Sequence, residues 1–205
     1  MDEMPIGVSI VEILLLIVAF SSGIAVAALI GSSRNDFLGD CMLYAKVNFT
    51  SPTHFTVIPG SVGKCSYCVG LQSVVITVAF FYALYRTFVL ITSKEISLLR
   101  FISVPIFMLL SFLVLIQAFV VSIGLHRFCL GLKSEPSFAN TDCDLFQKVQ
   151  WQYYDGSEFY DTLRMAEGAS WVSFISWCLL LVLGVFIAYK YRQYTKMTTS
   201  ISDKK

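Results

Sequence analysis

The sequence predicts an all-α membrane protein, a bundle of four transmembrane helices with two disulfide-containing extracellular or lumenal loops. Of the 205 residues, 56% are hydrophobic and only 14% are charged, against a usual charged share of roughly 25%. Four apolar segments each reach the roughly 20 residues that a helix needs to cross a bilayer. The shortage of charge excludes a soluble domain and a disordered chain, and the net charge of +1 excludes a nucleic-acid-binding protein.

The four expected spans belong to one tetraspan domain that covers residues 1–205. They are residues 8–30, 67–91, 102–125 and 169–189. The first span is expected to stay in the protein, because its flank begins Met-Asp-Glu and it is about twice as long as the apolar part of a signal peptide. A cleaved signal peptide is the alternative.

Basic residues set the expected orientation of these spans. The connection 92–101, its flanking Arg86 and the tail 190–205 together carry eight Lys or Arg residues. The long loops 31–66 and 126–168 carry seven over about three times that length. The positive-inside rule therefore predicts that both termini, the short connection and the tail are cytoplasmic. The two long loops would then face the lumen or the outside.

Four cysteines and one glycosylation motif fall in the long loops. Cys41 and Cys65 lie in the first loop, and Cys129 and Cys143 lie in the second. Even numbers of loop cysteines are typical of an oxidising compartment. Pairing within each loop is the simplest of the three connectivities, with cross-loop pairing and free thiols as alternatives. Asn48-Phe49-Thr50 is an N-glycosylation acceptor on the same side. No metal site or cofactor is expected.

Two charged residues interrupt the spans. Glu12 lies about one turn inside the cytoplasmic end of the first span, and Arg86 lies near the same end of the second. An intramembrane acid is by default a candidate functional residue. We expect Glu12 to form an ion pair with Arg86 or to reach the interface. A role in ion or proton coupling is the alternative, but no second buried acid completes a relay.

Small residues recur every four positions along the first span, at Ala19, Gly23, Ala27 and Gly31. This spacing makes a ridge that allows another helix to approach closely. We expect the ridge to pack inside the four-helix bundle. A docking face for the transmembrane helix of a partner protein is the alternative.

The end of the second long loop is rich in aromatic residues. A short helix is expected over residues 157–167, with Ser157 as its N-cap, lying on the surface of the bundle or the membrane. A partner-binding platform is the alternative interpretation. Its candidate residues are Trp151, Phe159, Tyr160, Leu163 and Trp171.

Several motifs, and the spacing between them, resemble those of the transmembrane protein 179 family. They are Phe159-Tyr160, Leu163, Ala166-Glu167, Ser170-Trp171-Val172, Trp177-Cys178, Cys41-Met42-Leu43-Tyr44, Val11-Glu12, Cys65-x-Tyr67, Cys129 and Cys143. The resemblance covers all four spans and both long loops. It implies a tetraspan protein of secretory or vesicular membranes and implies no enzyme activity. Claudins are expected to be less similar, because the first loop has no Trp and so lacks their Gly-Leu-Trp motif.

The absence of recognisable chemistry favours a non-enzymatic accessory or scaffold subunit in the plasma membrane or secretory membranes. Its expected contacts are the lipid bilayer and a larger membrane protein, such as a channel or receptor, reached through the first span and outer loops. An oligomeric channel or transporter is one alternative, although the spans lack a polar stripe. A structural tetraspan of vesicle membranes is another, and a homo-oligomer stays open. An enzyme is not expected, because only His54 and His126 are present and no catalytic motif includes them.

Overall fold

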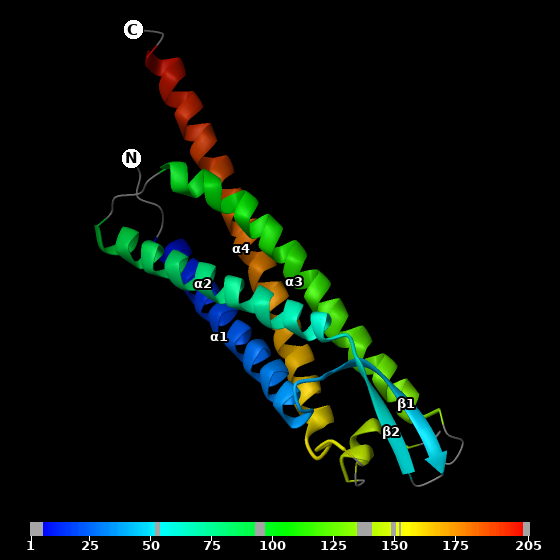
Figure 1. The fold of residues 1–205 in the computed structure, drawn as a ribbon. Helices are drawn as coiled ribbons and strands as arrows, with labels where there is room; N and C mark the ends of the chain where they lie inside the picture. The colour runs from blue at the N-terminus through cyan, green and yellow to red at the C-terminus, as the bar shows by residue number, and fades with distance from the viewer. Residues whose placement is uncertain are drawn as a thin grey trace.

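Four long helices form the body of the protein. The computed structural model describes residues 6–51, 54–92, 97–134, 141–148, 151 and 153–202. The helices are α1 (Ile6–Asp36), α2 (Val62–Thr92), α3 (Ser97–Leu132) and α4 (Phe159–Ser202). Figure 1 shows that α1 begins and α4 ends at one end of the bundle, which we name the terminal end. The strands lie at the opposite end, which we name the loop end.

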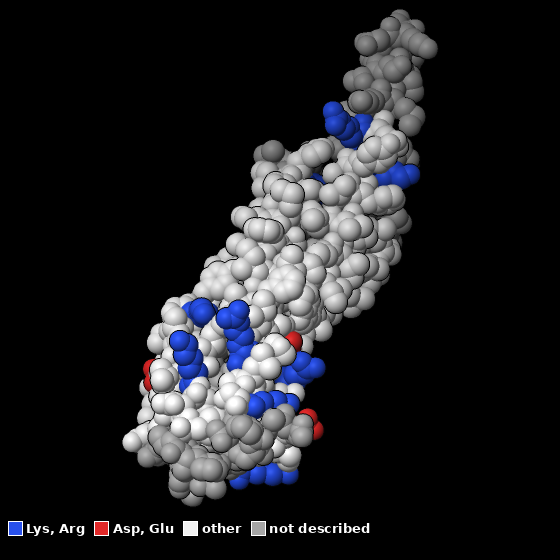
Figure 2. Space-filling view, turned by 90° about the vertical axis from the view of Figure 1, so that its right-hand side faces the viewer, with Lys and Arg blue, Asp and Glu red and all other residues white. Residues whose placement is uncertain are grey.

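Each of the four helices is long and apolar enough to cross a membrane. The 31 residues of α1 span about 47 Å at the rise of an α-helix, against a hydrocarbon core of roughly 30 Å. The helices therefore extend beyond the expected spans. Figure 2 shows charged side chains gathered at both ends of one face, with an uncharged band between them. The predicted architecture of an integral membrane protein with four membrane-spanning helices is confirmed.

The helices do not contact one another equally. α1 packs against both α2 and α4, and α3 packs against α4, while α2 and α3 lie further apart. Long polar side chains bridge this wider gap. Gln72 of α2 donates a hydrogen bond to Gln117 of α3 at 3.0 Å, and the hydroxyl of Tyr67 donates to the carbonyl oxygen of Leu113 at 3.3 Å. Both glutamines are fully buried.

A β-hairpin follows α1, where the sequence analysis expected only a loop. It pairs β1 (Cys41–Ser51) antiparallel with β2 (His54–Gly60). The stretches Val-Asn-Phe-Thr and Phe-Thr-Val-Ile that form its outer part are rich in β-branched and aromatic residues, which favour strands. β1 lies along α3, and Val47 of β1 lies beside Gly131 of α3.

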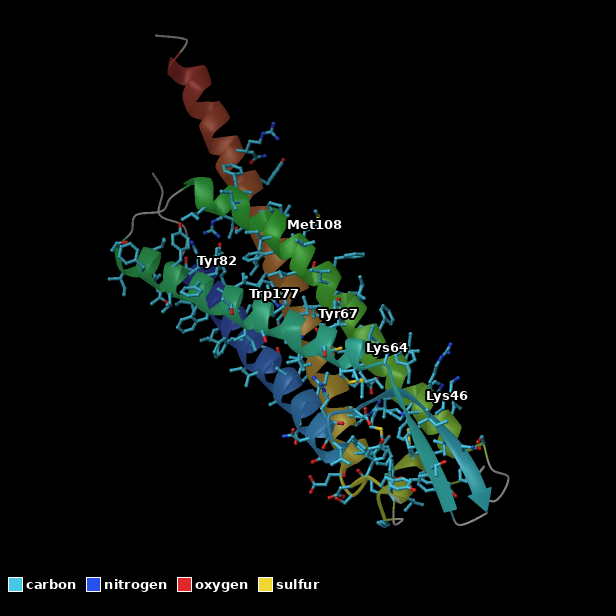
Figure 3. The ribbon with its side chains drawn as sticks, viewed as in Figure 1. Lys46, Lys64, Tyr67, Tyr82, Met108 and Trp177 are labelled. Carbon is cyan, nitrogen blue, oxygen red and sulfur yellow. A yellow bond between two sulfur atoms is a disulfide. The ribbon has the colours of Figure 1, made fainter. Side chains whose placement is uncertain are left out.

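A bulge shapes the start of the hairpin. The pairing register shifts between Cys41 and Lys46, and Tyr44 adopts a positive φ of 64° within that interval. The bulge drives the carbonyl oxygen of Leu43 so close to Gly60 that a side chain there would overlap it. The ammonium of Lys64, at the start of α2 (Figure 3), lies 3.5 Å from the centre of the Tyr44 ring. The cation–π contact stabilises this strained turn of the backbone.

Candidate functional site

A buried ion cluster joins three helices at the terminal end. Glu12 of α1 is 1% exposed, and its Oε2 lies 2.9 Å from Nε of Arg86 on α2. Arg100 of α3 donates from Nη1 to both oxygens of the same carboxylate, at 3.1 Å each. The side chains of Arg86 and Arg100 are 1% and 5% exposed. One carboxylate therefore pairs with two guanidinium groups at the point where α1, α2 and α3 meet.

Two hydroxyl groups extend the cluster. The Tyr82 hydroxyl donates to Oε1 of Glu12 at 3.2 Å, and Nη2 of Arg86 donates to the Ser9 hydroxyl at 3.1 Å. Tyr82 and Arg86 are four residues apart on α2, and Ser9 and Glu12 are three apart on α1, so each pair shares one helix face. Tyr82 lies on the terminal-end half of α2 (Figure 3).

The geometry gives the cluster a holding role. Both oxygens of the Glu12 carboxylate accept charge-assisted hydrogen bonds, which are roughly twice as strong as neutral ones. Removing one partner from a buried ion pair costs about 3–5 kcal/mol, because the other charge stays desolvated. The arrangement thus fixes the relative positions of three helices.

The sequence predicted only part of this cluster. The structure brings Glu12 and Arg86 together, as the expected ion pair requires. Arg100 was expected in the connection 92–101, whereas α3 begins at Ser97 and carries Arg100 into the bundle in its first turn. Hydropathy scores an arginine as polar, so Arg100 fell outside the expected third span. Hydropathy alone could not show that the Arg100 side chain turns into the bundle. The helical spacing of Tyr82 and Arg86 was the available signal for the tyrosine.

Two disulfides staple the loop end. Cys41 at the start of β1 is bonded to Cys65 in the first turn of α2, with 5.8 Å between their Cα atoms. Cys129 near the end of α3 is bonded to Cys143 at the start of the 3₁₀ helix η2 (Cys143–Lys148), with a Cα separation of 5.7 Å. Each bond joins two cysteines of the same loop. The disulfides attach the hairpin to α2 and the second loop to α3.

An aromatic core lies beneath the hairpin, with Trp151 at its centre. The indole ring lies 5.0 Å from the Phe159 ring, 5.5 Å from Phe55 and 5.7 Å from Phe37, between ring centroids. Its Nε1 donates a hydrogen bond to the carbonyl oxygen of Phe146 at 3.0 Å. Rings from the turn that follows α1, from β2 and from the start of α4 therefore pack on one side chain of the second loop.

The five aromatic and apolar residues considered for a partner platform occupy different environments. Phe159 and Leu163 are 3% and 1% exposed and belong to the core of the loop end. Trp151 and Tyr160 are half-buried. Trp171 is also half-buried, and its Nε1 donates to the Ser122 hydroxyl at 3.1 Å across to α3. The burial of Phe159 and Leu163 makes them packing residues rather than a free surface.

The expected surface helix over 157–167 is not a separate element, because α4 begins at Phe159 and continues through the membrane span. Its N-cap also differs from the expectation. The Gln147 Oε1 accepts from the backbone N–H groups of Tyr160 and Asp161 at 2.9 and 3.1 Å. The backbone N–H of Ser157 instead donates to Asp155. The cap comes from η2, 13 residues earlier in the chain, so the local sequence around Ser157 could not reveal it.

The ridge of small residues on α1 divides into two halves. Ala19 and Gly23 are buried, and a Cβ at Gly23 would lie 2.9 Å from Cγ1 of Ile76 on α2. Ala27 and Gly31 are half-buried, and a Cβ at Gly31 would meet no atom within 4 Å. The terminal-end half of the ridge thus packs inside the bundle, while the loop-end half faces outward.

Asn48 of the glycosylation motif has an exposed side chain on β1. Its backbone carbonyl oxygen accepts a hydrogen bond from the Thr56 hydroxyl of β2 at 3.2 Å. Within the described parts of the chain, no three His, Cys, Asp or Glu side chains gather closely enough to hold a metal ion.

Comparisons with known proteins agree with an integral membrane protein. The family model Transmembrane protein 179/179B Claudin domain matches residues 8–205. Transmembrane protein 179B of Danio rerio is 29% identical over 185 residues, which are 88% of this chain and 84% of that protein. The proteins of that name from Mus musculus and Homo sapiens are each 28% identical, over 84% and 85% of this chain and 80% of each relative. No solved structure matches the chain.

The description of the family model corrects one expectation. Claudins were expected to be less similar because the first loop lacks their tryptophan motif, yet the matching domain is described as a claudin domain. The architecture is therefore claudin-like even where that local motif is missing. Because the model covers nearly the whole chain, this protein belongs to the transmembrane protein 179/179B claudin-domain family.

Proposed function

We propose that this protein is a non-enzymatic accessory or scaffold subunit that associates with a larger integral membrane protein, such as a channel or receptor. In this proposal both termini are cytoplasmic, and the hairpin and second loop face the lumen or the outside. The partner contacts the loop-end half of α1 and the neighbouring outer loops. The two disulfides attach the outer loops to α2 and α3 and so hold them in a fixed arrangement.

The observation that carries this proposal is the composition of the outward face of α1 near the loop end. Ala28 and Ser32 are exposed there, beside half-buried Gly31. Small residues bring helix backbones close together, and this close packing drives helix association where lipid supplies no hydrophobic force.

The outward faces of the other helices provide the contrast. α2 exposes Phe81 by 64% and Phe88 by 61%, and α3 exposes Met108 by 59% and Phe112 by 59%. Large side chains of this kind are suited to contact with fluid lipid tails. A helix that faces only lipid gains nothing from alanine, glycine and serine, so the α1 surface fits a protein partner better.

The test is co-purification of the full chain with its partner after mild detergent extraction, followed by quantitative mass spectrometry. Gly31→Leu adds bulk to the proposed contact without an internal clash, so the partner should be lost while the chain stays folded. Gly70→Leu on α2 is the matched control, because a Cβ there also meets no atom within 4 Å. A larger membrane protein present in stoichiometric amount with wild type and G70L, and depleted with G31L, supports the proposal.

Two results would overturn the proposal. Equal recovery of the partner with G31L and G70L would remove α1 from the contact. A pure homo-oligomer that conducts ions in planar bilayers would replace the accessory role with a channel.

The orientation of the chain is tested separately through Asn48. Its exposed side chain is accessible to the glycosylation machinery if the hairpin enters the lumen. Enzymatic deglycosylation should then increase the gel mobility of wild type and leave Asn48→Gln unchanged. A wild-type chain without a glycan, combined with protease access to the hairpin from the cytoplasm, would reverse the proposed orientation.

A further inference from the structure

An open groove of about 820 Å³ lies between α3 and α4 at the loop end. The wall formed by η2 includes Cys143 and Asp144, and Cys129 lies in the α3 wall. The volume falls within the range of roughly 300–1,000 Å³ that is usual for small-molecule sites. This groove has no part in the proposed contact on α1.

The polarity of the groove changes along its length. Phe119, Ile123 and Trp171 line the part that lies deeper in the bundle, and Phe119 and Ile123 are 48% and 43% exposed. Lys133, in the turn that follows α3, lies 14 residues beyond Phe119, which is about 21 Å at the rise of an α-helix. The groove therefore runs from an apolar wall open to the bilayer to a charged rim, as an amphipathic ligand requires.

The basic residues of the rim already have acidic neighbours. Nη1 of Arg164 lies 2.6 Å from the carboxylate of Glu167, and Nζ of Lys133 lies 4.0 Å from that of Asp142. The Arg164–Glu167 pair is close, whereas the Lys133–Asp142 pair is long and exposed to solvent. These two pairs cancel the formal charges of the lysine and arginine that line the groove.

Two further carboxylates give the rim a net negative charge. Asp144 of η2 and Asp161 of α4 are both exposed and both line the groove. Oδ2 of Asp161 accepts a hydrogen bond from the neutral amide of Gln147. The rings of Tyr160 and Trp171 also line the groove. Carboxylates together with aromatic faces are the combination that attracts a quaternary ammonium group.

The walls of the groove are fixed before any ligand arrives. The Cys129–Cys143 disulfide ties η2 to α3, and the Gln147 side chain ties η2 to the first turn of α4. The hydrogen bond from Trp171 to Ser122 joins α4 to α3 at the apolar part of the groove. A preformed site loses less conformational entropy when it binds.

We propose that this groove binds a choline phospholipid from the leaflet on the loop side of the membrane. The quaternary ammonium lies among Asp144, Asp161 and the ring of Tyr160. The lipid phosphate lies toward Arg164, and an acyl chain follows Phe119 and Ile123 into the bilayer.

The test uses the full chain purified in a maltoside detergent that contains no choline. The protein is offered equal amounts of phosphatidylcholine, phosphatidylethanolamine and phosphatidylglycerol with identical acyl chains, and retained lipid is counted by native mass spectrometry. We expect retention of the choline lipid to exceed that of each competitor roughly fivefold. Equal retention of the ethanolamine lipid would overturn the choline assignment. A preference for the anionic glycerol lipid would overturn the charge argument.

Removing the two carboxylates should abolish the preference. Asp144→Asn with Asp161→Asn keeps the size of both side chains and should bring the ratio of retained choline lipid to retained glycerol lipid close to one. Asp36→Asn is the matched control, since Asp36 is also exposed at the loop end and lies outside the groove. A preference that survives in the double variant would overturn the proposed headgroup site.

A second measurement uses the unmodified chain and so does not depend on the folding of a variant. A phosphatidylcholine with a photoreactive acyl chain should label peptides that contain residues 119–133 and 160–171. Uniform labelling of all lipid-facing helices would mean that the probe reports only the surrounding annular lipid, and it would overturn the proposal.

Discussion

The two ends of the bundle are held together by different physical means. At the terminal end, Glu12 binds Arg86 and Arg100 in a buried ion cluster that links α1, α2 and α3. At the loop end, two disulfides and an aromatic core around Trp151 connect the hairpin, η2 and the helices. One end thus depends on desolvated charges and the other on covalent bonds and ring packing.

The difference follows from what each end must hold. At the terminal end, α2 and α3 hardly contact each other. Arg86 of α2 and Arg100 of α3 both reach Glu12 of α1, and these ion pairs can fix the spacing of the two helices. The loop end is built from a two-stranded hairpin and a 3₁₀ helix. A hairpin of this size is only marginally stable alone, and a disulfide stabilises it by restricting the unfolded chain. Each end can therefore be weakened separately.

The largest effect is expected from Glu12→Gln. The substitution removes the negative charge shared by Arg86 and Arg100, and it should lower the free energy of unfolding by about 3–5 kcal/mol. The measurement is thermal unfolding of the purified protein in detergent, monitored by circular dichroism. Glu167→Gln is the matched control, because it removes the same charge from a pair whose arginine is 64% exposed. That change should cost less than about 1 kcal/mol. Equal stabilities of the two variants would show that the buried cluster does not hold the terminal end.

The next effect is expected from Cys41→Ser combined with Cys65→Ser. The bond closes a loop with a sequence separation of 24 residues, and its loss should cost about 3 kcal/mol. Limited proteolysis should then cleave the hairpin while the terminal half of the helices stays protected. Cys178→Ser serves as the control, since Cys178 forms no disulfide in the structure. Cleavage spread evenly over both ends would contradict the independence of the two ends.

A smaller effect is expected in the aromatic core. A Cβ at Gly156 would overlap the indole ring of Trp151, which other rings hold in place. Gly156→Ala should therefore cost about 1–3 kcal/mol through overpacking, measured by thermal unfolding. Gly168→Ala is the control, because a Cβ in that open position on α4 meets no atom within 4 Å. The control should stabilise the helix slightly. If both variants unfold like wild type, Trp151 does not fix the core of the loop end.

The sequence predicted the features that depend on hydrophobic length and on compartment chemistry. Four apolar segments gave the membrane helices, and loop cysteines gave the disulfides. The features it missed depend on contacts between distant residues. Arg100 enters the bundle only because α3 starts earlier than hydropathy indicates, and Gln147 caps α4 from 13 residues away. The β-branched and aromatic residues of the hairpin were a local signal for strands. The sequence prediction did not use this signal, because it relied on the long apolar segments and treated the residues between them as loops.

The smallest expected effect is a pH dependence confined to the loop end. The backbone N–H of Ser157 donates to Oδ1 of Asp155 at 3.0 Å, and this hydrogen bond lowers the pKa of the Asp155 carboxyl below its ordinary value of 3.8. A lowered pKa in the folded state means that the charged form stabilises the fold. The contribution is fully present above the ordinary value and is lost as the pH falls through it toward the lower folded-state pKa.

Asp155→Asn tests this contribution against the rest of the molecule. Thermal unfolding of wild type and variant should be compared between about pH 6 and pH 3, which brackets the upper part of this window. The stability difference between the two proteins should shrink as the pH falls, because the wild-type carboxyl becomes protonated. Asp155 also donates its backbone N–H to the carbonyl oxygen of Asp36, a contact that the variant keeps. A difference that stays constant with pH would show that the turn depends on that backbone contact and not on the carboxylate.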